Sequence, residues 1–288
     1  MPLVTLAEVL KEADARGYAV GAFNCNNMEI VQAIIAAAEA EGAPVIIQAS
    51  QGAIKYAGLD YITALVRVAA AATSIPVVLH LDHGTDFDQV LRCLRAGFTS
   101  VMIDGSKYPL AENIALTRRV VEIAHAMGAS VEGELGRIGG TEEHISVSAR
   151  EATMTDPEEA RRFAAETGVD ALAIAIGTAH GRYYGTPHLD FDRLATIDRQ
   201  VPTPLVLHGS SGVPDADIRR AVELGVRKIN IDTDIRIAFL EATRQALAAD
   251  PEEIDPRKVL GPAREAATAV IRHKMQVFGC AGRARATH

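Results

Sequence analysis

Residues 77–103 read VVLHLDHGTDFDQVLRCLRAGFTSVMI and contain one complete unit of the predicted architecture. The apolar, β-branched run at 77–81 predicts a buried strand, and the apolar periodicity of 87–96 predicts an amphipathic helix. A second apolar run at 100–103 predicts the next strand. A strand, a helix and a strand in this order form a parallel βαβ unit whose sheet is covered by helices.

The same alternation extends along the whole chain. The other predicted strands span residues 19–24, 45–49, 130–134, 171–176, 205–208 and 228–231. Helical periodicity is found at 29–41, 61–72, 112–127, 157–167, 216–224 and 235–249, and an additional helix is predicted at 262–278. Eight strands that alternate with helices favour a closed (β/α)8 TIM barrel over an open doubly wound sheet. We expect residues 1–288 to form a single domain, because barrels of this length are routinely one domain.

Residues 136–155 interrupt the alternation of strands and helices. This stretch is long and polar and contains Gly139-Gly140, so we expect a mobile loop. Long loops at a barrel mouth often act as lids, and this one is therefore expected to cover the site.

Composition and charge argue against several classes of function. The formal net charge of -8, without any basic block, argues against binding to nucleic acid or to an anionic membrane. No apolar run approaches the ~18 residues of a membrane span, and no signal peptide is recognised. Cys25, Cys93 and Cys280 are widely spaced and form no CxxC pair, which indicates packed, reduced thiols and a cytoplasmic protein.

Polar residues follow nearly every predicted strand. In chain order these residues are Asn24, Ser50, Asp82-His83, Asp104, Glu134, His180, His208 and Asn230 to Asp232. Active sites of (β/α)8 barrels lie at the carboxyl ends of the strands, so these side chains are expected to meet at one mouth. A helix cap or a turn would explain Asp104 or Asn24 taken singly, but it would not explain the joint pattern.

Histidines dominate three of these strand ends. They stand in the runs His80-Leu81-Asp82-His83-Gly84, Thr178-Ala179-His180-Gly181 and His208-Gly209-Ser210-Ser211-Gly212. Three neutral imidazoles with an open fourth position are the usual ligand set of a catalytic zinc ion. The sequence therefore predicts a zinc site at the barrel mouth.

With these motifs the chain resembles the class II, metal-dependent ketose-bisphosphate aldolases, which include fructose-1,6-bisphosphate and tagatose-1,6-bisphosphate aldolases. Besides the histidine runs, the resemblance rests on Pro2-Leu3-Val4, Phe23-Asn24, Val101-Met102-Ile103-Asp104, Val131-Glu132-Gly133-Glu134-Leu135-Gly136, Asp255-Pro256-Arg257-Lys258 and Gly261-Pro262-Ala263-Arg264-Glu265. It covers essentially the whole chain in order. It implies a lyase that reversibly cleaves fructose 1,6-bisphosphate to dihydroxyacetone phosphate and glyceraldehyde 3-phosphate through a zinc-stabilised enediolate, as in glycolysis and gluconeogenesis.

The resemblance also implies the metal ligands. His83, His180 and His208 match the zinc ligands, whereas Asp104 and Glu134 match an alternative or second divalent-metal position, where carboxylates could instead orient the histidines. The native metal stays open between zinc, cobalt, manganese and iron. We interpret His80 as a packed or supporting histidine, because an offset of three along a strand would put it on the face opposite to His83.

Two acids match the proton carriers of the resembled family. Asp82 matches the residue that exchanges the proton of the C4 hydroxyl, and confinement is expected to raise its pKa. Glu142 matches the loop glutamate that moves the second proton, with Glu143 as a rival. A Schiff-base mechanism would need a suitably placed lysine. The predicted sixth strand has none, and Lys228 on the eighth is interpreted as structural, which favours the metal mechanism.

Substrate binding is expected at amides, glycines and hydroxyls of the strand ends. The predicted residues are Asn24, Ser50, Gly181, Gly209, Ser210, Ser211, Asn230, Ile231, Asp232, Thr233 and Arg236. Backbone N–H groups after the seventh and eighth strands are suited to a triose phosphate, and the resemblance adds sodium or potassium beside it. Asp232 and Arg236 favour fructose over tagatose bisphosphate, since tagatose enzymes more often have a small residue at the first position.

Two other classes of function stay open at this point. A zinc hydrolase on the same barrel would use the same ligands but would have no reason to contain two phosphate-binding loops. A non-catalytic binding barrel is disfavoured by the intact set of acids and histidines. The resemblance also suggests a homodimer or a homotetramer, with the additional C-terminal helix at the interface.

Overall fold

A closed barrel of parallel strands forms the centre of the protein. The computed structural model describes residues 3–142, 145–148, 152–183 and 185–284. Among these residues eight strands close the barrel in the order β1 (Val20–Asn24), β11 (Val226–Ile231), β10 (Leu205–Leu207), β8 (Ala171–Ile174), β5 (Ser130–Leu135), β4 (Ser100–Ile103), β3 (Val77–Gly84) and β2 (Val45–Ser50). The predicted (β/α)8 barrel is confirmed.

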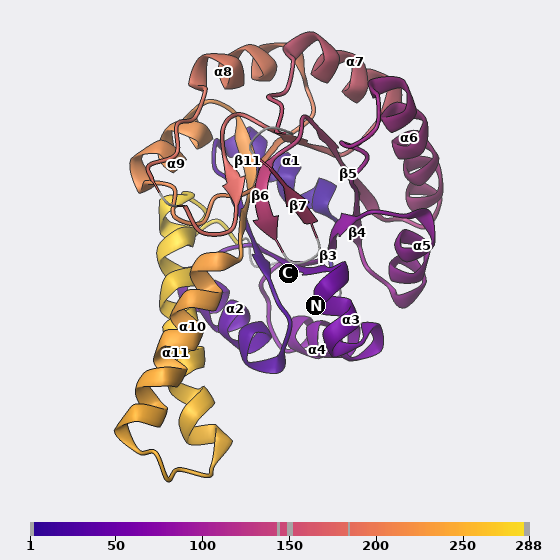
Figure 1. The fold of residues 1–288 in the computed structure, drawn as a ribbon. Coiled ribbons are helices and arrows are strands. Elements are labelled where there is room, and N and C mark those ends of the chain that lie inside the picture. The colour runs from indigo at the N-terminus through magenta and orange to yellow at the C-terminus, as the bar shows by residue number, and fades with distance from the viewer. Residues whose placement is uncertain (1–2, 143–144, 149–151, 184, 285–288) are drawn as a thin grey trace.

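Helices surround the barrel (Figure 1). In chain order they are α1 (Leu6–Arg16), α2 (Met28–Glu41), α3 (Gln51–Ala57), α4 (Leu59–Ala71), α5 (Phe87–Ala96), α6 (Leu110–Ala126), α7 (Pro157–Thr167), α8 (Phe191–Gln200), α9 (Asp215–Glu223), α10 (Thr233–Ala249) and α11 (Pro256–Val277). The predicted bounds of α5 and α7 are correct to the residue. Asp156 explains the sharp start of α7, because its side chain accepts hydrogen bonds from two backbone N–H groups of the first turn.

Three helices were not predicted from the sequence, namely α1, α3 and α8. α1 does carry a recognisable signal, since Thr5 and Glu8 form a reciprocal capping box. α11 begins at Pro256, six residues before the predicted start at Pro262, which lies inside the helix. Pro256 follows the capping residue Asp255 and is the true first-turn proline.

The barrel strands are buried at every position except Arg227 in β11. Burial on both faces explains why their sequences read as continuous apolar runs. The barrel strands nevertheless contain polar side chains with at most 3% exposure, among them Gln48, His80, Ser100, Ser130, Glu132 and Lys228. Buried polar groups require partners, and several of these residues lead directly to the site described below.

The stretch 136–155 differs from the predicted mobile loop. β6 (Gly139–Glu142) and β7 (Ile145–Val147) form an antiparallel hairpin, and β6 pairs in parallel with β9 (Ala179–His180). The hairpin thereby lies against the strand that carries a predicted metal ligand. Residues 143–144 and 149–151 of this stretch lie outside the described residues.

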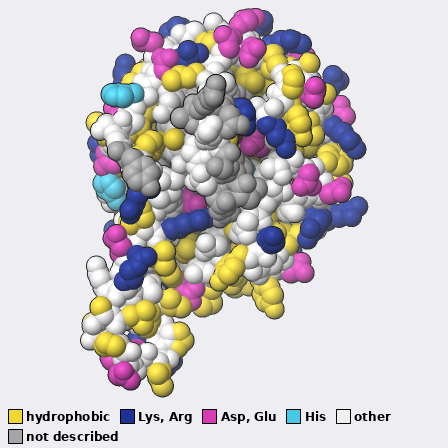
Figure 2. Space-filling view, in the orientation of Figure 1, with side chains coloured by type: hydrophobic (Ala, Val, Ile, Leu, Met, Phe, Trp, Pro, Cys, Tyr) yellow, Lys and Arg dark blue, Asp and Glu magenta, His cyan; other side chains and the backbone are white. Residues whose placement is uncertain are grey.

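α10 and α11 pack against each other and project beyond one side of the barrel (Figure 1). Hydrophobic side chains are visible on this projection (Figure 2). Leu240 and Leu247 of α10 are exposed, and so is Ile254, which lies between α10 and α11. Among the described residues, no helix has both the length and the apolarity needed to cross a membrane.

Candidate active site

Three histidines from separate strands meet at the carboxyl end of the barrel. His83 lies in β3, His180 in β9, and His208 directly after β10. His83 Nε2 lies 3.1 Å from His208 Nδ1, and the ring centroid of His180 lies 5.0 Å from that of His83 and 5.9 Å from that of His208. One nitrogen of each ring lies within 4.8 Å of the others, which is compact enough for a shared metal ion. The structure thus brings the three predicted ligands together.

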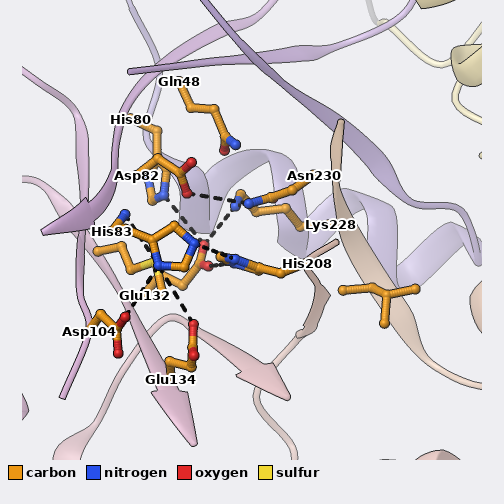
Figure 3. Close-up of polar contacts among 12 residues, drawn as sticks. Gln48, His80, Asp82, His83, Asp104, Glu132, Glu134, His208, Lys228 and Asn230 are labelled. Atoms are coloured by element: carbon orange, nitrogen blue, oxygen red, sulfur yellow. Dashed lines mark hydrogen bonds and ion pairs between the residues drawn. The ribbon is translucent and has the colours of Figure 1, made fainter. Parts of the chain in front are cut away.

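The backbone at His83 aims its ring into the site. His83 has a φ of 48°, the only positive φ of a non-glycine residue in the described part of the chain. The register between β3 and β4 shifts here, between Leu81 and Gly84. This irregularity interrupts the alternation of the strand, so both His80 and His83 reach the barrel interior (Figure 3). The prediction that they lie on opposite faces is therefore wrong.

Burial gives two of the histidines the protonation state that a metal requires. It lowers the pKa of His180 and of His208 well below the ordinary value, and the proximity of His83 adds to the effect. Both rings are then neutral near pH 7 and keep a lone pair for a metal. Burial also opposes the charged form of His83, but Asp82 and Asp104 outweigh it and raise the pKa of His83 well above its ordinary value. A metal ion must displace that proton to bind His83, and the proximity of the three ring nitrogens then suits a divalent ion.

Two carboxylates approach the opposite side of the His83 ring. Asp104 Oδ2 lies 3.3 Å from His83 Nδ1, and Glu134 Oε2 lies 3.9 Å from the same nitrogen (Figure 3). Burial and the neighbouring Asp104 raise the pKa of Glu134 well above its ordinary value. Although burial opposes it, the hydrogen bond and charge of His83 lower the pKa of Asp104. This group suits either a second metal position or the orientation of His83.

Asp82 is held beside the histidines by two amides. Asn24 Nδ2 donates to Asp82 Oδ2 at 2.8 Å, and Asn230 Nδ2 donates to Asp82 Oδ1 at 3.3 Å. Gln48 in turn donates to Asn24 Oδ1 at 2.6 Å. Burial opposes ionisation, but His83 and His208 outweigh it and lower the pKa of Asp82, contrary to the direction expected from confinement. The carboxylate is thus ionised and able to accept a proton.

The predicted phosphate loops lie side by side. Ser211 Oγ accepts hydrogen bonds from the backbone N–H groups of Asp232 at 3.4 Å and Asp234 at 3.2 Å, which joins the loop after β10 to the end of β11. A Cβ atom at Gly209 would lie 2.5 Å from Ala179 O, so only glycine allows this close approach. These contacts bring the loop after β10 next to the start of α10.

The other predicted substrate residues occupy the same rim. Ser50 pairs in register with Asp82 and caps α3, and Gly181 lies against the backbone of Thr141. Asn230 and Ile231 end β11, whereas Thr233 begins α10.

Asp232 Oδ1 accepts from Arg236 Nε at 2.6 Å, so these two predicted residues are paired with each other. Ser210 is buried directly after Gly209, and its Oγ donates to Leu207 O.

The two loop acids differ in how far the structure describes them. Glu142 ends strand β6, which places its backbone next to the strand that carries His180. Glu143 lies outside the described residues.

Three residues that sequence reasoning did not assign to the site contact it directly. The Tyr183 hydroxyl accepts from Ala179 N at 2.6 Å and donates to Gly209 O at 2.8 Å, and thereby joins the loops of two histidines. Glu132 Oε1 lies 2.8 Å from His208 Nε2, and Lys228 Nζ lies 2.9 Å from Glu132 Oε2 (Figure 3). Strand alternation could have found the last two, because each precedes a predicted site residue by two positions on its strand.

Comparisons with known proteins agree with this geometry. Residues 4–283 match the family described as Fructose-bisphosphate aldolase class-II. The chain is 50% identical to the fructose-bisphosphate aldolase of Thermus caldophilus, over 98% of this chain and 100% of that protein. It is 46% identical to a probable fructose-bisphosphate aldolase of Bacillus subtilis, over 99% and 100%. A crystal structure of a putative fructose-1,6-bisphosphate aldolase from Coccidioides immitis superposes with a TM-score of 0.90 at 31% identity, covering 96% of this chain and 97% of that one.

Proposed function

The chain belongs to the class II fructose-bisphosphate aldolase family, a family of metal-dependent lyases, and from this premise we propose how its site works. The reaction is the reversible cleavage of fructose 1,6-bisphosphate to dihydroxyacetone phosphate and glyceraldehyde 3-phosphate. The observation that carries the assignment of residues is the convergence of His83, His180 and His208 beside the ionised Asp82.

The three histidines hold the catalytic metal, which we propose to be zinc. When bound, such an ion supplies a Lewis acid that stabilises the negative charge developing on the carbonyl oxygen of the ketose. Asp104 and Glu134 provide a second position for a divalent ion on the far side of His83. A sodium or potassium ion beside the phosphate loops completes the proposed set of ions.

Two acids move protons in the proposed mechanism. Asp82 takes the proton of the C4 hydroxyl during carbon–carbon cleavage, and Asn24 and Asn230 keep its two oxygens in fixed directions. Glu142 exchanges the second proton, at the carbon of dihydroxyacetone phosphate that was bonded to the aldehyde fragment. Its location on the hairpin beside His180 supports this role.

The loops after β10 and β11 bind the triose phosphate through backbone N–H groups and through Ser210 and Ser211. Gly181, Ser50, Ile231 and Thr233 line the rest of the proposed binding site. Asp232 and Arg236 hold the distal part of the sugar, which favours fructose over tagatose bisphosphate. The ion pair between them supports this proposal, because it keeps the guanidinium at the rim of the barrel.

We further propose that the protein forms a homodimer or a homotetramer through the projecting helices α10 and α11. The apolar side chains of this projection support an interface, since Ile254 is 95% exposed and Leu240 is 48% exposed in the single chain. The cytoplasm is the proposed compartment. The three buried cysteines support it, because none of them belongs to a disulfide among the described residues.

A coupled assay of triose-phosphate release tests the assignment. Fructose 1,6-bisphosphate and tagatose 1,6-bisphosphate are supplied to metal-loaded protein, to chelated protein and to the His208→Ala variant. We expect preference for the fructose compound and loss of activity in the latter two samples. Preference for the tagatose compound would contradict the roles of Asp232 and Arg236, and activity that survives chelation would contradict the metal mechanism.

A further inference from the structure

Lys228 lies inside the barrel below the histidines. It is completely buried on β11, and its ammonium group has no access to solvent. A buried cation is strongly unfavourable unless other groups compensate its charge. The proposed reaction uses no lysine, so the presence of a buried cation at this position requires a separate explanation.

The ammonium group has two acceptors that belong to different parts of the site. Lys228 Nζ lies 2.9 Å from Glu132 Oε2 and 2.7 Å from Asn230 Oδ1. Figure 3 shows Lys228 beside Asn230 and Glu132, with Asp82 and His208 nearby. Glu132 also contacts His208, and Asn230 also contacts Asp82.

The first branch reaches a metal ligand. Glu132 is completely buried, and its second oxygen lies 2.8 Å from His208 Nε2. A carboxylate only accepts hydrogen bonds, so Nε2 carries the hydrogen of the neutral ring. The lone pair is then on Nδ1, which is the nitrogen that lies 3.1 Å from His83 Nε2. The glutamate therefore selects the tautomer of His208 that can bind a metal.

The second branch reaches the proton acceptor. Asn230 accepts from Lys228 through Oδ1, which leaves its NH₂ group to donate to Asp82 at 3.3 Å. The opposite amide orientation would place NH₂ against the ammonium group and an oxygen against the carboxylate. The lysine thus favours the one orientation of Asn230 that supports Asp82.

We infer that Lys228 is a positioning residue that orients both the metal ligand His208, through Glu132, and the proton acceptor Asp82, through Asn230. The inference rests on the proposed function of the histidine site. Lys228 does not act on the substrate, because it is completely buried below the strand ends and both contacts go to protein groups.

The Lys228→Met variant tests this inference, since methionine fills similar space without the charge. Metal affinity is measured by competition with a chromogenic chelator, and kcat and KM are measured with fructose 1,6-bisphosphate. We expect metal affinity to fall about 10- to 100-fold, as is typical for residues that support metal ligands. We also expect kcat to fall while KM stays near that of the wild type, because Lys228 does not touch the substrate. A folded variant with wild-type affinity and kcat overturns the inference, and so does a KM that rises in step with the loss of kcat.

A double variant guards against misfolding. Lys228→Met alone leaves Glu132 buried without its cation, whereas Lys228→Met combined with Glu132→Gln removes both charges and is expected to fold. Its kcat should stay low, because Asn230 is still unoriented; a wild-type kcat overturns the inference. Lys274→Met is the matched control, because Lys274 is another buried lysine, 2.9 Å from Asp234, and its loss should leave metal affinity unchanged.

A different experimental result would contradict the proposed function. If the wild-type protein releases no triose phosphate from either bisphosphate, the reaction is wrong. The comparison of metal affinities between the wild type, Lys228→Met and Lys274→Met still decides whether Lys228 supports His208.

Discussion

At the scale of single residues, His83 has a strained backbone conformation, and its side chain belongs to the candidate metal site. A positive φ in a non-glycine residue costs on the order of 1–3 kcal/mol and persists only where the surroundings enforce it. Here the surroundings are the contacts of the ring with His208 on one side and with Asp104 on the other. The histidine motif was sufficient to predict that His83 belongs to the candidate site. The local irregularity that turns His83 to the same side as His80 depends on pairing with β4, which no pattern within β3 reveals.

Asp82→Asn tests the proton acceptor at this scale. The variant keeps the size of the side chain but removes its basicity, so we expect kcat to fall by about 10²- to 10⁴-fold, the usual contribution of general acid–base catalysis. Folding and metal affinity are measured as controls, because the new NH₂ group faces a donor of Asn24 or Asn230. Circular dichroism, chelator competition and the coupled assay measure the three quantities, and a kcat within a factor of three of the wild type would contradict the role of Asp82.

At the scale of elements, the hairpin β6–β7 differs most from its prediction. Its sequence is polar and rich in glycine, which is typical of a loop. The hairpin exists because β9 offers it a partner strand, and that contact is distant in sequence. Gly140 allows the contact, since its φ is 100° and a Cβ atom there would lie 2.1 Å from His180 O. The same pairing places Gly140, two residues before Glu142, opposite the proposed metal ligand His180.

Gly140→Ala should therefore separate the hairpin from β9. We expect a loss of kcat of at least about tenfold together with weaker metal binding, because the backbone of His180 must move to admit the methyl group. Gly128→Ala is the matched control: Gly128 also has a positive φ, at 75°, but nothing lies within 4 Å of its added Cβ. It should lose only about 1 kcal/mol of stability and keep its kcat. Equal kcat values for the two variants would argue against the hairpin's role.

At the scale of the whole molecule, closure of the barrel creates the site. β1 lies between β2 and β11, which brings the first and last strands of the barrel together and allows Asn24 and Asn230 to hold the same carboxylate. The chain carries a formal net charge of -8, so the molecule as a whole does not attract an anionic sugar bisphosphate. We therefore expect binding to come from local groups, such as those of the two loops proposed to bind phosphate.

Metal binding should stabilise the whole barrel, since the proposed ligands lie on β3, on β9 and directly after β10. An ion at 100 times its dissociation constant adds about 2.7 kcal/mol to the free energy of unfolding. We expect a chelator to lower the melting temperature of the wild type by several degrees in scanning calorimetry. The His208→Ala variant should show a much smaller change, and an equal change in both proteins would place the stabilising ion elsewhere.

The barrel, most of its helices and the candidate ligands were predictable from sequence because they depend on local signals. Apolar runs predict buried strands, capping residues such as Asp156 mark helix starts, and histidines beside glycines mark the strand ends. Three features could not be predicted in this way: the pairing of Glu132 with Lys228, the link that Tyr183 makes between two loops, and the inward turn of His83. Each of them joins strands or loops that are distant along the chain, and they become neighbours only when the barrel closes.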